Sequence, residues 1–426
     1  MKICFVNDST SQNNWGCRAT TYAMYDLIQK TDAEVVSIVK LGALNGVGSD
    51  PYNIKTRAIS LLKEYSYERP KLRAGLRVAQ NALRRRRQGR IADPQTMEDF
   101  EVTAREVKAG RLFPVTRQAI EAADLVMVNG EGSIYNFEKK GRMSLFWMYY
   151  AKRHAGKKCV IVNHTVQLND ERMRALVQAV YPMLDDVVFR EPASFDEAAR
   201  ILPYTEDALS ADAAFRWKPL TGQAFLDAYG RKGACTVFPF DSSTFDPSRP
   251  YICITGSSAL LRAEDQSAVD RSPFVTLCGE LGKLCDQVLV VAPDATDEVL
   301  LAPVARKLSL PFLPANTPMG MGLDILANAR AFISGRWHPS ILASTGGTPS
   351  VLFSGNTHKI AGLGRLLGLP DASIDAKQLG AATPAILQMT QRFLDEGDDR
   401  RRDILARVAG HAKLAEKNIR CLQPSV

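Results

Sequence analysis

An arginine and a histidine two residues apart, Arg336 and His338, form the pattern in this sequence best suited to chemistry. They follow a strand expected at residues 331–334, and Pro339 after them suits the first turn of a helix. A guanidinium fork, an imidazole and free helical N–H groups at one point predict a site for a phosphate or carboxylate. Lys359, after a further expected strand, adds charge to this pocket or starts a solvated helix. The alternative is structural, with Arg336 in a buried salt bridge and His338 as a helix cap.

A carboxylate between two glycines follows another expected strand, at residues 125–128. Gly130 and Gly132 would let the backbone approach a ligand closely, and Glu131 would then face that ligand as a general base, with Ser133 next in the loop. The spacing is not G-x-G-x-x-G, so it does not predict a dinucleotide site. A purely structural glycine-rich turn is the alternative.

A histidine and an arginine follow two more expected strands of the first half. His164 comes after residues 159–162, and Arg190 comes after residues 187–189. Parallel strands end at one edge of a sheet, so we expect both side chains to point toward the same ligand. The alternatives are a structural histidine and an arginine paired with a nearby acid such as Asp212.

A polar loop follows the first expected strand, at residues 3–6, and contains Asp8, Asn14 and Arg18. Polar residues and a glycine, Gly16, at a strand-to-helix turn can present backbone N–H groups to an anion. The loop is therefore a candidate acceptor or anion-binding loop, and a helix cap without a ligand is an equal alternative.

The elements that position these residues are short apolar runs rich in Val and Ile, which alternate with longer helical patterns. In the first half the runs cover residues 3–6, 35–39, 125–128, 159–162 and 187–189. In the second half they cover residues 251–254, 288–292, 331–334 and 350–353. This alternation is typical of parallel sheets with crossover helices, and it restarts after a proline-rich stretch. The sequence therefore predicts an α/β protein with two Rossmann-type domains facing a central cleft, where ligands bind at the carboxyl ends of the strands.

The expected boundaries follow from that restart. They are a first domain at residues 1–215 with a basic helical insertion at about 66–112, a linker at 216–250, a second domain at 251–385, and a helical segment at 386–426 that packs back on the first domain.

Composition limits the class of protein. The 426 residues are 46% hydrophobic and 23% charged, values typical of a globular protein with two cores. No apolar run reaches the roughly 18 to 20 residues that span a bilayer, and no signal-peptide core precedes the first strand, so we expect a cytoplasmic protein. The eight cysteines contain no C-x-x-C pair, so neither a metal site nor a disulfide framework is expected.

Positive charge is concentrated in one segment. Residues 69–90 contain nine basic residues and no acidic one, which exceeds the net charge of +8, and they carry leucines at helical spacing. Such a basic amphipathic helix is typical of attachment to anionic membranes, here at the inner membrane face, and a solvated insertion helix is the alternative. No aromatic residues interleave the arginines, so no nucleic-acid partner is expected.

The chain resembles the polysaccharide pyruvyl transferase family. The matching pieces are the turn at residues 129–133, the segments at 190–194 and 212–215, and the stretch from 334 to 359, in which R-x-H is followed by G-x-P and a lysine. The resemblance implies a glycosyltransferase B-type architecture with an acceptor side in the first domain and a donor side in the second. It also implies transfer of a pyruvyl group from phosphoenolpyruvate to a sugar hydroxyl of a polysaccharide or its lipid-linked precursor, with no cofactor.

Carried over by position, the resemblance implies that Arg336, His338 and Arg190 bind the donor and that His164 is the general acid. Glu131 between its glycines and Pro339 after the histidine depart from the family pattern. These departures resemble some bacterial sialyltransferases, so a metal-independent glycosyltransferase with a nucleotide-activated sugar is the second hypothesis, with Glu131 as base and His338 at the departing phosphate. A non-catalytic protein that holds polysaccharide precursors at the membrane is the third.

Overall fold

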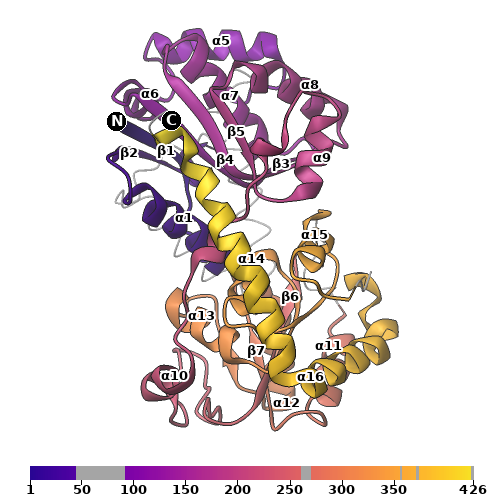
Figure 1. Cartoon of the computed structure of the whole chain (residues 1–426). Helices are drawn as coiled ribbons and strands as arrows, with labels where there is room; N and C mark the ends of the chain where they lie inside the picture. The colour runs from indigo at the N-terminus through magenta and orange to yellow at the C-terminus, as the bar shows by residue number, and fades with distance from the viewer. Residues whose placement is uncertain (45–91, 261–269, 356, 371–373, 424–426) are drawn as a thin grey trace. The chain divides into compact units, whose positions relative to one another are not determined.

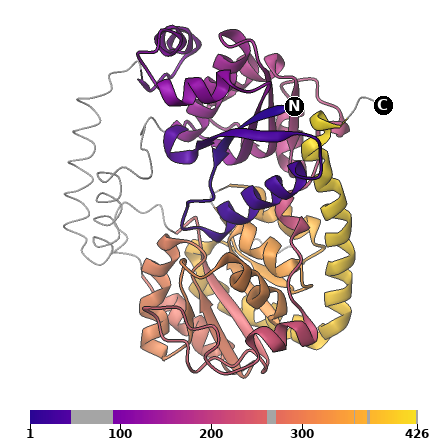
Figure 2. The same cartoon turned by 90° about the vertical axis from the view of Figure 1, so that its left-hand side faces the viewer.

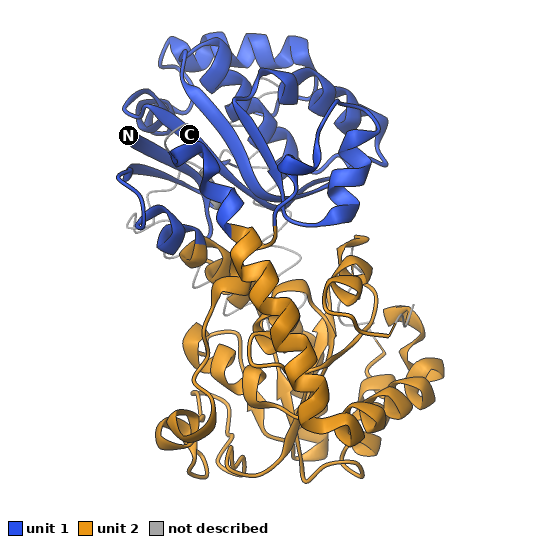
Figure 3. Cartoon of the chain, in the orientation of Figure 1, with its two compact units in different colours: residues 1–9, 24–210, 416–426 blue, residues 10–23, 211–415 orange. Residues whose placement is uncertain are grey.

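The computed structural model describes residues 1–44, 92–260, 270–355, 357–370 and 374–423 (Figure 1). The chain divides into two compact units (Figure 3). The first unit comprises residues 1–9, 24–210 and 416–426, and the second comprises residues 10–23 and 211–415. The basic helix predicted at residues 69–90 lies outside the described residues, as does most of the insertion predicted at 66–112.

The first unit is built on a parallel five-stranded sheet in the order β2-β1-β3-β4-β5. Its strands are β1 (Lys2–Asp8), β2 (Glu34–Lys40), β3 (Leu125–Tyr135), β4 (Lys158–Gln167) and β5 (Asp186–Phe189). The helices along this part of the chain are α1 (Trp15–Ile28), α2 (Leu41–Leu44), α5 (Met97–Lys108), α6 (Pro114–Glu121), α7 (Lys139–Arg153), α8 (Glu171–Val180) and α9 (Pro192–Ala199). The first residues of α1 belong to the second unit.

Both faces of this sheet are covered. Successive residues of a strand point to opposite faces, yet Ile3, Cys4, Phe5 and Val6 are all 0% exposed. Helix α7 is buried along its whole middle, which is typical of a helix enclosed on every side. Continuous burial explains why β1, inside the sheet, is an unbroken apolar run, whereas the edge strand β2 alternates between exposed and less exposed residues.

The second unit contains another parallel five-stranded sheet, in the order β10-β9-β6-β7-β8. Its strands are β6 (Tyr251–Ser257), β7 (Gln287–Val291), β8 (Phe312–Leu313), β9 (Ala331–Gly335) and β10 (Ser350–Leu352). Its helices are the short 3-10 helix η4 (Ala213–Arg216) and α10 (Gly222–Tyr229), α11 (Ser272–Leu281), α12 (Ala295–Leu308), α13 (Met319–Asn328), α14 (Trp337–Ser344), α15 (Lys359–Leu366) and α16 (Leu379–Leu414).

Alternate residues of β6 enter two different cores, one on each face of this sheet. Ile252 and Ile254 pack in a cluster with residues of α11, α12 and α16. Tyr251 and Cys253 pack in a second cluster with residues of α13 and with Trp15 at the start of α1. The helices of the second unit can be followed in the two views of Figures 1 and 2. The predicted fold class, α/β with two Rossmann-type domains, is confirmed.

Several boundaries differ from those expected. Residues 10–23 group with the second unit because Trp15 and Ala19 lie in its core. The stretch expected as a linker, 216–250, contains α10 and also contributes Phe225, Cys235 and Phe245 to that core. Helix α16 begins at Leu379 and stays with the second unit, and only residues 416–426 join the first.

Two strands also run further than their apolar segments. β3 continues to Tyr135 and β4 to Gln167, so Glu131 and His164 lie within strands, paired in register, and not in loops. β8 was not expected, because two residues between proline and turn segments carry no strand pattern.

Candidate functional site

Arg336 lies between the end of β9 and the start of α14 in the second unit. The turn is held by serines: Ser334 Oγ accepts the Arg336 backbone N–H at 3.0 Å, and Ser340 Oγ donates to the Arg336 carbonyl at 2.8 Å. Pro339 lies in the first turn of α14, as predicted. β9 neighbours β6, and strand order reverses at that pair, so Arg336 sits at the position where open α/β sheets bind ligands.

Carboxylates at the start of α12 hold the Arg336 guanidinium. Its Nη2 lies 2.9 Å from Oδ1 of Asp297 and 3.9 Å from Oδ1 of Asp294, and it donates to Thr296 Oγ1 at 3.2 Å. Asp297 is fully buried, whereas the Arg336 side chain is 14% exposed. Nη1 donates to none of the residues that the structure describes. The structural alternative is thus partly realised, because Arg336 forms a buried ion pair while one edge of its fork stays open.

Burial and charge act against each other in this pair. Burial raises the pKa of Asp297 to about 6, against the opposing effect of Arg336. For Arg336, burial lowers the pKa, but Asp297 and Asp294 outweigh burial and leave the pKa raised. The guanidinium therefore stays cationic at neutral pH, and it can attract an anion.

A second carboxylate orients His338. Nε2 of His338 lies 3.3 Å from Oδ2 of Asp212, and the same oxygen accepts the indole N–H of Trp337 at 2.9 Å. The other oxygen of Asp212 accepts the Ala214 backbone N–H at 2.9 Å and caps η4. Because Asp212 is fully buried and fixed by these donors, it sets the position of the His338 ring.

The Asn14 to Arg18 segment joins this cluster. Asn14 Nδ2 donates to Oδ2 of Asp294 at 2.6 Å. A side chain at Gly16 would place its Cβ 2.4 Å from Nδ1 of His338, so only glycine leaves room for the ring. Arg18 donates to the Ala315 carbonyl at 2.9 Å. The structure thus brings together Arg336, His338 and a loop that the sequence placed in the other domain. We call Asp212, Asp297, Arg336 and His338, with Gly16 beside them, the Arg–His site.

Lys359 is the first residue of α15 and follows β10, the strand next to β9. Its side chain is half-buried. The expectation that Lys359 adds charge to the Arg–His site stays a prediction.

Glu131 forms the centre of a different cluster, in the first unit. The residue is 3% exposed, Ser9 Oγ donates to its Oε1 at 2.6 Å, and Lys140 Nζ lies 3.5 Å from its Oε2. Gly132 beside it is half-buried. A serine and a lysine around a carboxylate suit a polar ligand.

Three residues near the ends of neighbouring strands have left-handed backbone conformations that are uncommon outside glycine. Their φ values are +69° at Asn7, +45° at Glu131 and +53° at Asn163. Side-chain bonds hold them: Asn7 Nδ2 donates to the Asn129 carbonyl at 2.5 Å, and Asn418 Oδ1 accepts the Asn163 backbone N–H at 2.7 Å. Backbone strain of this kind clusters at functional sites, and here it surrounds the β1–β3 pair, where strand order reverses.

Other residues predicted for this site lie deeper. A side chain on Gly130 would place its Cβ 2.1 Å from Cβ of His164, so this glycine packs against the histidine. Ser133 is 1% exposed. Asp8, also 1% exposed, accepts the Tyr25 hydroxyl at 2.5 Å.

His164 is fully buried, and both of its ring nitrogens have partners. Nδ1 lies 2.8 Å from the Val188 carbonyl, and the Tyr181 hydroxyl lies 3.1 Å from Nε2. Burial lowers the pKa of His164 to about 4, so the ring is neutral at neutral pH. This geometry favours the structural alternative over a general acid. Arg190 is also fully buried, and its Nε donates to Thr165 Oγ1 at 2.9 Å.

Sequence analysis missed Asp294, Thr296 and Asp297. A signal existed, because P-D-A-T-D directly follows the strand expected at 288–292, where ligand-facing residues are found. In the described part of the chain, no group of three or more His, Cys, Asp or Glu side chains could hold a metal ion. None of the described helices is long and apolar enough to cross a membrane.

Solved structures with the same fold include two whose similarity extends over nearly the whole chain. UDP-GlcNAc 2-epimerase from Neisseria meningitidis matches with a TM-score of 0.53 and 10% identity over 99% of both chains. The UDP-forming trehalose-phosphate synthase from Burkholderia xenovorans matches with a TM-score of 0.52 and 12% identity over 99% of this chain and 98% of that one. At this identity the likeness shows the fold alone, the glycosyltransferase B type.

The comparison with curated proteins gives no match. The model of the polysaccharide pyruvyl transferase family matches residues 14–357, which is most of the chain. That range begins at Asn14 and includes every residue of the Arg–His site. This match identifies the protein as a transferase and not as a non-catalytic protein that holds precursors. The chain belongs to the polysaccharide pyruvyl transferase family.

Proposed function

We propose that this protein transfers the pyruvyl group of phosphoenolpyruvate to a sugar hydroxyl of a cell-surface polysaccharide or its lipid-linked precursor. The observation that carries the proposal is the Arg–His site, where Arg336 and His338 stand two residues apart, each held by its own buried carboxylate. Membership of the family supports the same donor.

The site suits a small dianion. The Arg336 guanidinium and the N–H groups at the start of α14 both follow β9 directly, and both kinds of group favour a phosphate or carboxylate. Phosphoenolpyruvate carries both groups on a three-carbon skeleton. Asp297 neutralises part of the Arg336 charge, so the pocket discriminates by geometry as well as by charge.

The reaction needs a proton at the methylene carbon of the donor while a sugar hydroxyl adds to the neighbouring carbon. Phosphate then leaves this carbon, and a second hydroxyl of the same sugar adds to it, which completes a ketal. The protons released by the two hydroxyls balance the proton taken up by the methylene carbon and the charge of the departing phosphate. We assign the proton to His338 and not to His164, because Asp212 orients the His338 ring and offsets a positive charge on it. Gly16 packs against the Nδ1 side of the ring, where an added Cβ would lie 2.4 Å from Nδ1, so this glycine also fixes the ring position.

The competing function is glycosyl transfer from a nucleotide-activated sugar. One observation favours it: Glu131 is a buried carboxylate in a left-handed conformation beside Ser9 and Lys140, which suits a base for an acceptor hydroxyl. The Neisseria neighbour was solved with UDP-GlcNAc bound, and the Burkholderia neighbour is UDP-forming. In a pyruvyl transferase, the same Glu131 cluster would hold the acceptor sugar.

Calorimetric titration with phosphoenolpyruvate, CMP, UDP and GDP separates the two functions. We expect phosphoenolpyruvate alone to bind, and thermal unfolding at about one hundred times its Kd to show about 2.7 kcal/mol of added stability. Phosphate release with a panel of sugar acceptors then tests transfer. Binding of a nucleotide in place of phosphoenolpyruvate would replace the proposal with glycosyl transfer.

A further inference from the structure

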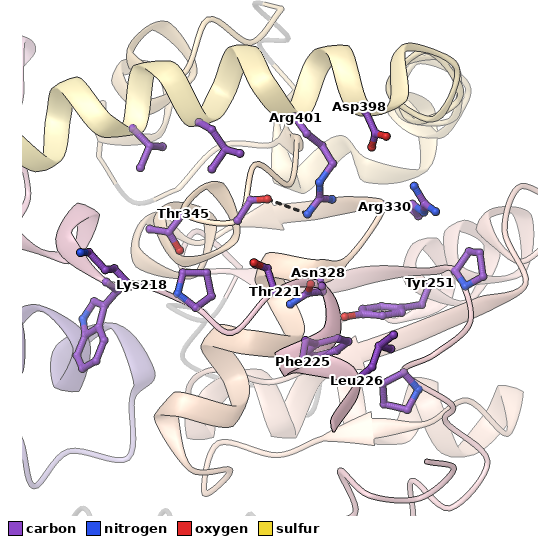
Figure 4. A pocket seen from close by; sticks show the side chains of 18 of the residues that line it. Lys218, Thr221, Phe225, Leu226, Tyr251, Asn328, Arg330, Thr345, Asp398 and Arg401 are labelled. Atoms are coloured by element: carbon purple, nitrogen blue, oxygen red, sulfur yellow. Dashed lines mark hydrogen bonds between the residues drawn. The ribbon is translucent and has the colours of Figure 1, made fainter. Parts of the chain in front are cut away.

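A second pocket lies in the second unit, at the end of the sheet opposite the Arg–His site. It encloses about 740 Å³ and is lined by α16, by α10 and by the segments that precede β6 and β9 (Figure 4). Tyr251 in its wall is the first residue of β6, and Arg330 immediately precedes β9. Arg336 follows β9 at its other end, and five residues of strand span about 17 Å. A ligand in this pocket therefore does not touch a donor at the Arg–His site.

Positive charge dominates the lining. The basic residues are Arg216, Lys218, Arg249, Arg330 and Arg401, and the acidic residue is Asp398. Arg249 is neutralised by Asp286 at 3.0 Å. Arg330 and Lys218 form no ion pair with any residue in the described ranges. The pocket thus keeps cationic groups that no described carboxylate neutralises.

Arg401 places a further cation in the wall without a carboxylate partner in the described part of the chain. Its guanidinium donates to the carbonyls of Ala327, Ala329 and Gly346 at 2.7, 2.8 and 2.8 Å, at the C-terminal ends of α13 and α14. Figure 4 shows Arg401 in the wall of the pocket. Burial lowers the pKa of Arg401, and the nearby charge of Arg330 lowers it further. Asp398, which also lines the pocket, offsets part of this effect, and an anion bound in the pocket would offset more of it.

The same pocket exposes apolar side chains. Leu226 on α10 is 39% exposed and Leu405 on α16 is 41% exposed, and both lie in the lining. Phe225 and Val408 add buried apolar surface beside them. Apolar side chains next to unneutralised cations suit a ligand that has a charged head and a hydrocarbon body.

We propose that this pocket binds a phosphate monoester with an aliphatic body. Arg330 and Arg401 would hold the phosphate, with Lys218 near its rim, while Leu226 and Leu405 pack against the hydrocarbon. A dianionic phosphate fits better than a carboxylate because the lining of the pocket contains several basic side chains. This proposal is independent of the donor and acceptor proposed above.

Isothermal titration of the full chain with hexyl phosphate, inorganic phosphate and hexanol tests the proposal. We expect hexyl phosphate to bind more tightly than inorganic phosphate, and hexanol not to bind. Arg330→Glu should lower the affinity for hexyl phosphate at least about tenfold. Leu405→Asp should also weaken it, while Arg365→Glu, which reverses an exposed arginine outside this pocket, should leave it unchanged.

Titration with farnesyl phosphate shows whether the natural ligand is a lipid phosphate or a small phosphorylated metabolite. Binding tighter than that of hexyl phosphate indicates a lipid phosphate, and equal binding indicates a small phosphorylated metabolite. Arg336→Lys should not change either affinity, so failure of the donor proposal leaves this test intact. Equal binding of hexyl phosphate to wild type and to a folded Arg330→Glu variant would overturn the proposal, and so would the absence of binding to wild type.

Discussion

Arg336 is the residue on which the donor site most depends, and its geometry can be separated from its charge. Replacement by lysine keeps the positive charge. It removes the guanidinium fork, in which Nη2 pairs with Asp297 and Nη1 donates to no described residue. We expect the affinity for phosphoenolpyruvate to fall about tenfold or more, as calorimetry would measure it, since a hydrogen bond to a charged group contributes about 1.5 to 3 kcal/mol. Arg365→Lys, which changes an exposed arginine outside both sites, is the matched control. Equal donor affinity in wild type and the Arg336→Lys variant would remove Arg336 from the donor site.

Glu131 distinguishes the two candidate reactions. If it is the base of a glycosyltransferase, Glu131→Gln should lower kcat by about 10² to 10⁴ with little change in donor binding. The proposed pyruvyl transfer predicts a milder loss, expressed mainly as a higher KM for the acceptor, because glutamine still accepts the Ser9 hydroxyl. Steady-state kinetics with varied acceptor measures the difference. A collapse of kcat at unchanged acceptor KM would contradict the assignment of Glu131 to acceptor binding.

At the scale of the elements, the start of α1 must lie against the His338 ring. Gly16 is the second residue of α1, and an added Cβ would come within 2.4 Å of Nδ1 of His338. Gly320 is the second residue of α13, where nothing lies within 4 Å of an added Cβ. Alanine normally favours a helix over glycine by up to about 1 kcal/mol. We therefore expect Gly320→Ala to leave activity and melting temperature unchanged or improved.

The same substitution at Gly16 should have the opposite result. Gly16→Ala should displace either His338 or the start of α1, and reduce kcat/KM for the donor at least about tenfold. Melting curves of both variants would separate displacement of the ring from unfolding. A fully active Gly16→Ala protein would show that the ring position does not matter.

At the scale of the whole molecule, His164 ties stability to pH. The pKa of His164 in the folded protein is about 4, below the ordinary value of 6.5. The stability that the neutral ring contributes is therefore fully present above pH 6.5 and is lost as the pH falls toward 4. At pH 4.5 the loss amounts to about 2 to 3 kcal/mol. Asp297, with a folded pKa of about 6, acts in the opposite direction and destabilises the fold as pH rises from 3.8 through 6.

Urea unfolding of the wild type and of His164→Asn at pH 7 and 4.5 isolates the effect of the histidine on stability. Asp297 is present in both proteins, so its effect cancels in the difference between them. Asparagine retains an N–H for the Val188 carbonyl but does not titrate. The stability difference between the two proteins should shrink at the lower pH. A difference that stays constant would mean that His164 is not a buried neutral histidine.

Attachment to membranes is also a property of the whole molecule, and it remains a prediction from sequence. We propose that the segment 69–90 binds anionic lipid at about 1 kcal/mol per basic residue near the surface. Replacing Arg84, Arg85, Arg86 and Arg87 with glutamate should release the protein from vesicles that contain phosphatidylserine, in a salt-dependent sedimentation assay. Unchanged sedimentation, or none with the wild type, would make the segment a solvated insertion.

The sequence alone determined the parallel sheets and the positions of Arg336 and His338, because both depend on local patterns. A buried parallel strand needs a short apolar run, and a ligand-facing residue follows that run directly. Pro339 marked the start of α14 for the same local reason. None of these inferences required knowledge of which distant segments meet.

Only the tertiary structure decided what surrounds those residues. Asp212 lies 125 residues from Trp337, Asp294 lies 280 residues from Asn14, and the carboxylate that pairs with Arg336 comes from α12. The burial of His164, which favours a structural role over that of a general acid, depends on packing against Tyr181 and the strand beside it. A sequence specifies which residues follow a strand, but contacts between distant segments are selected by the packing of the whole core, and that packing has no local signature.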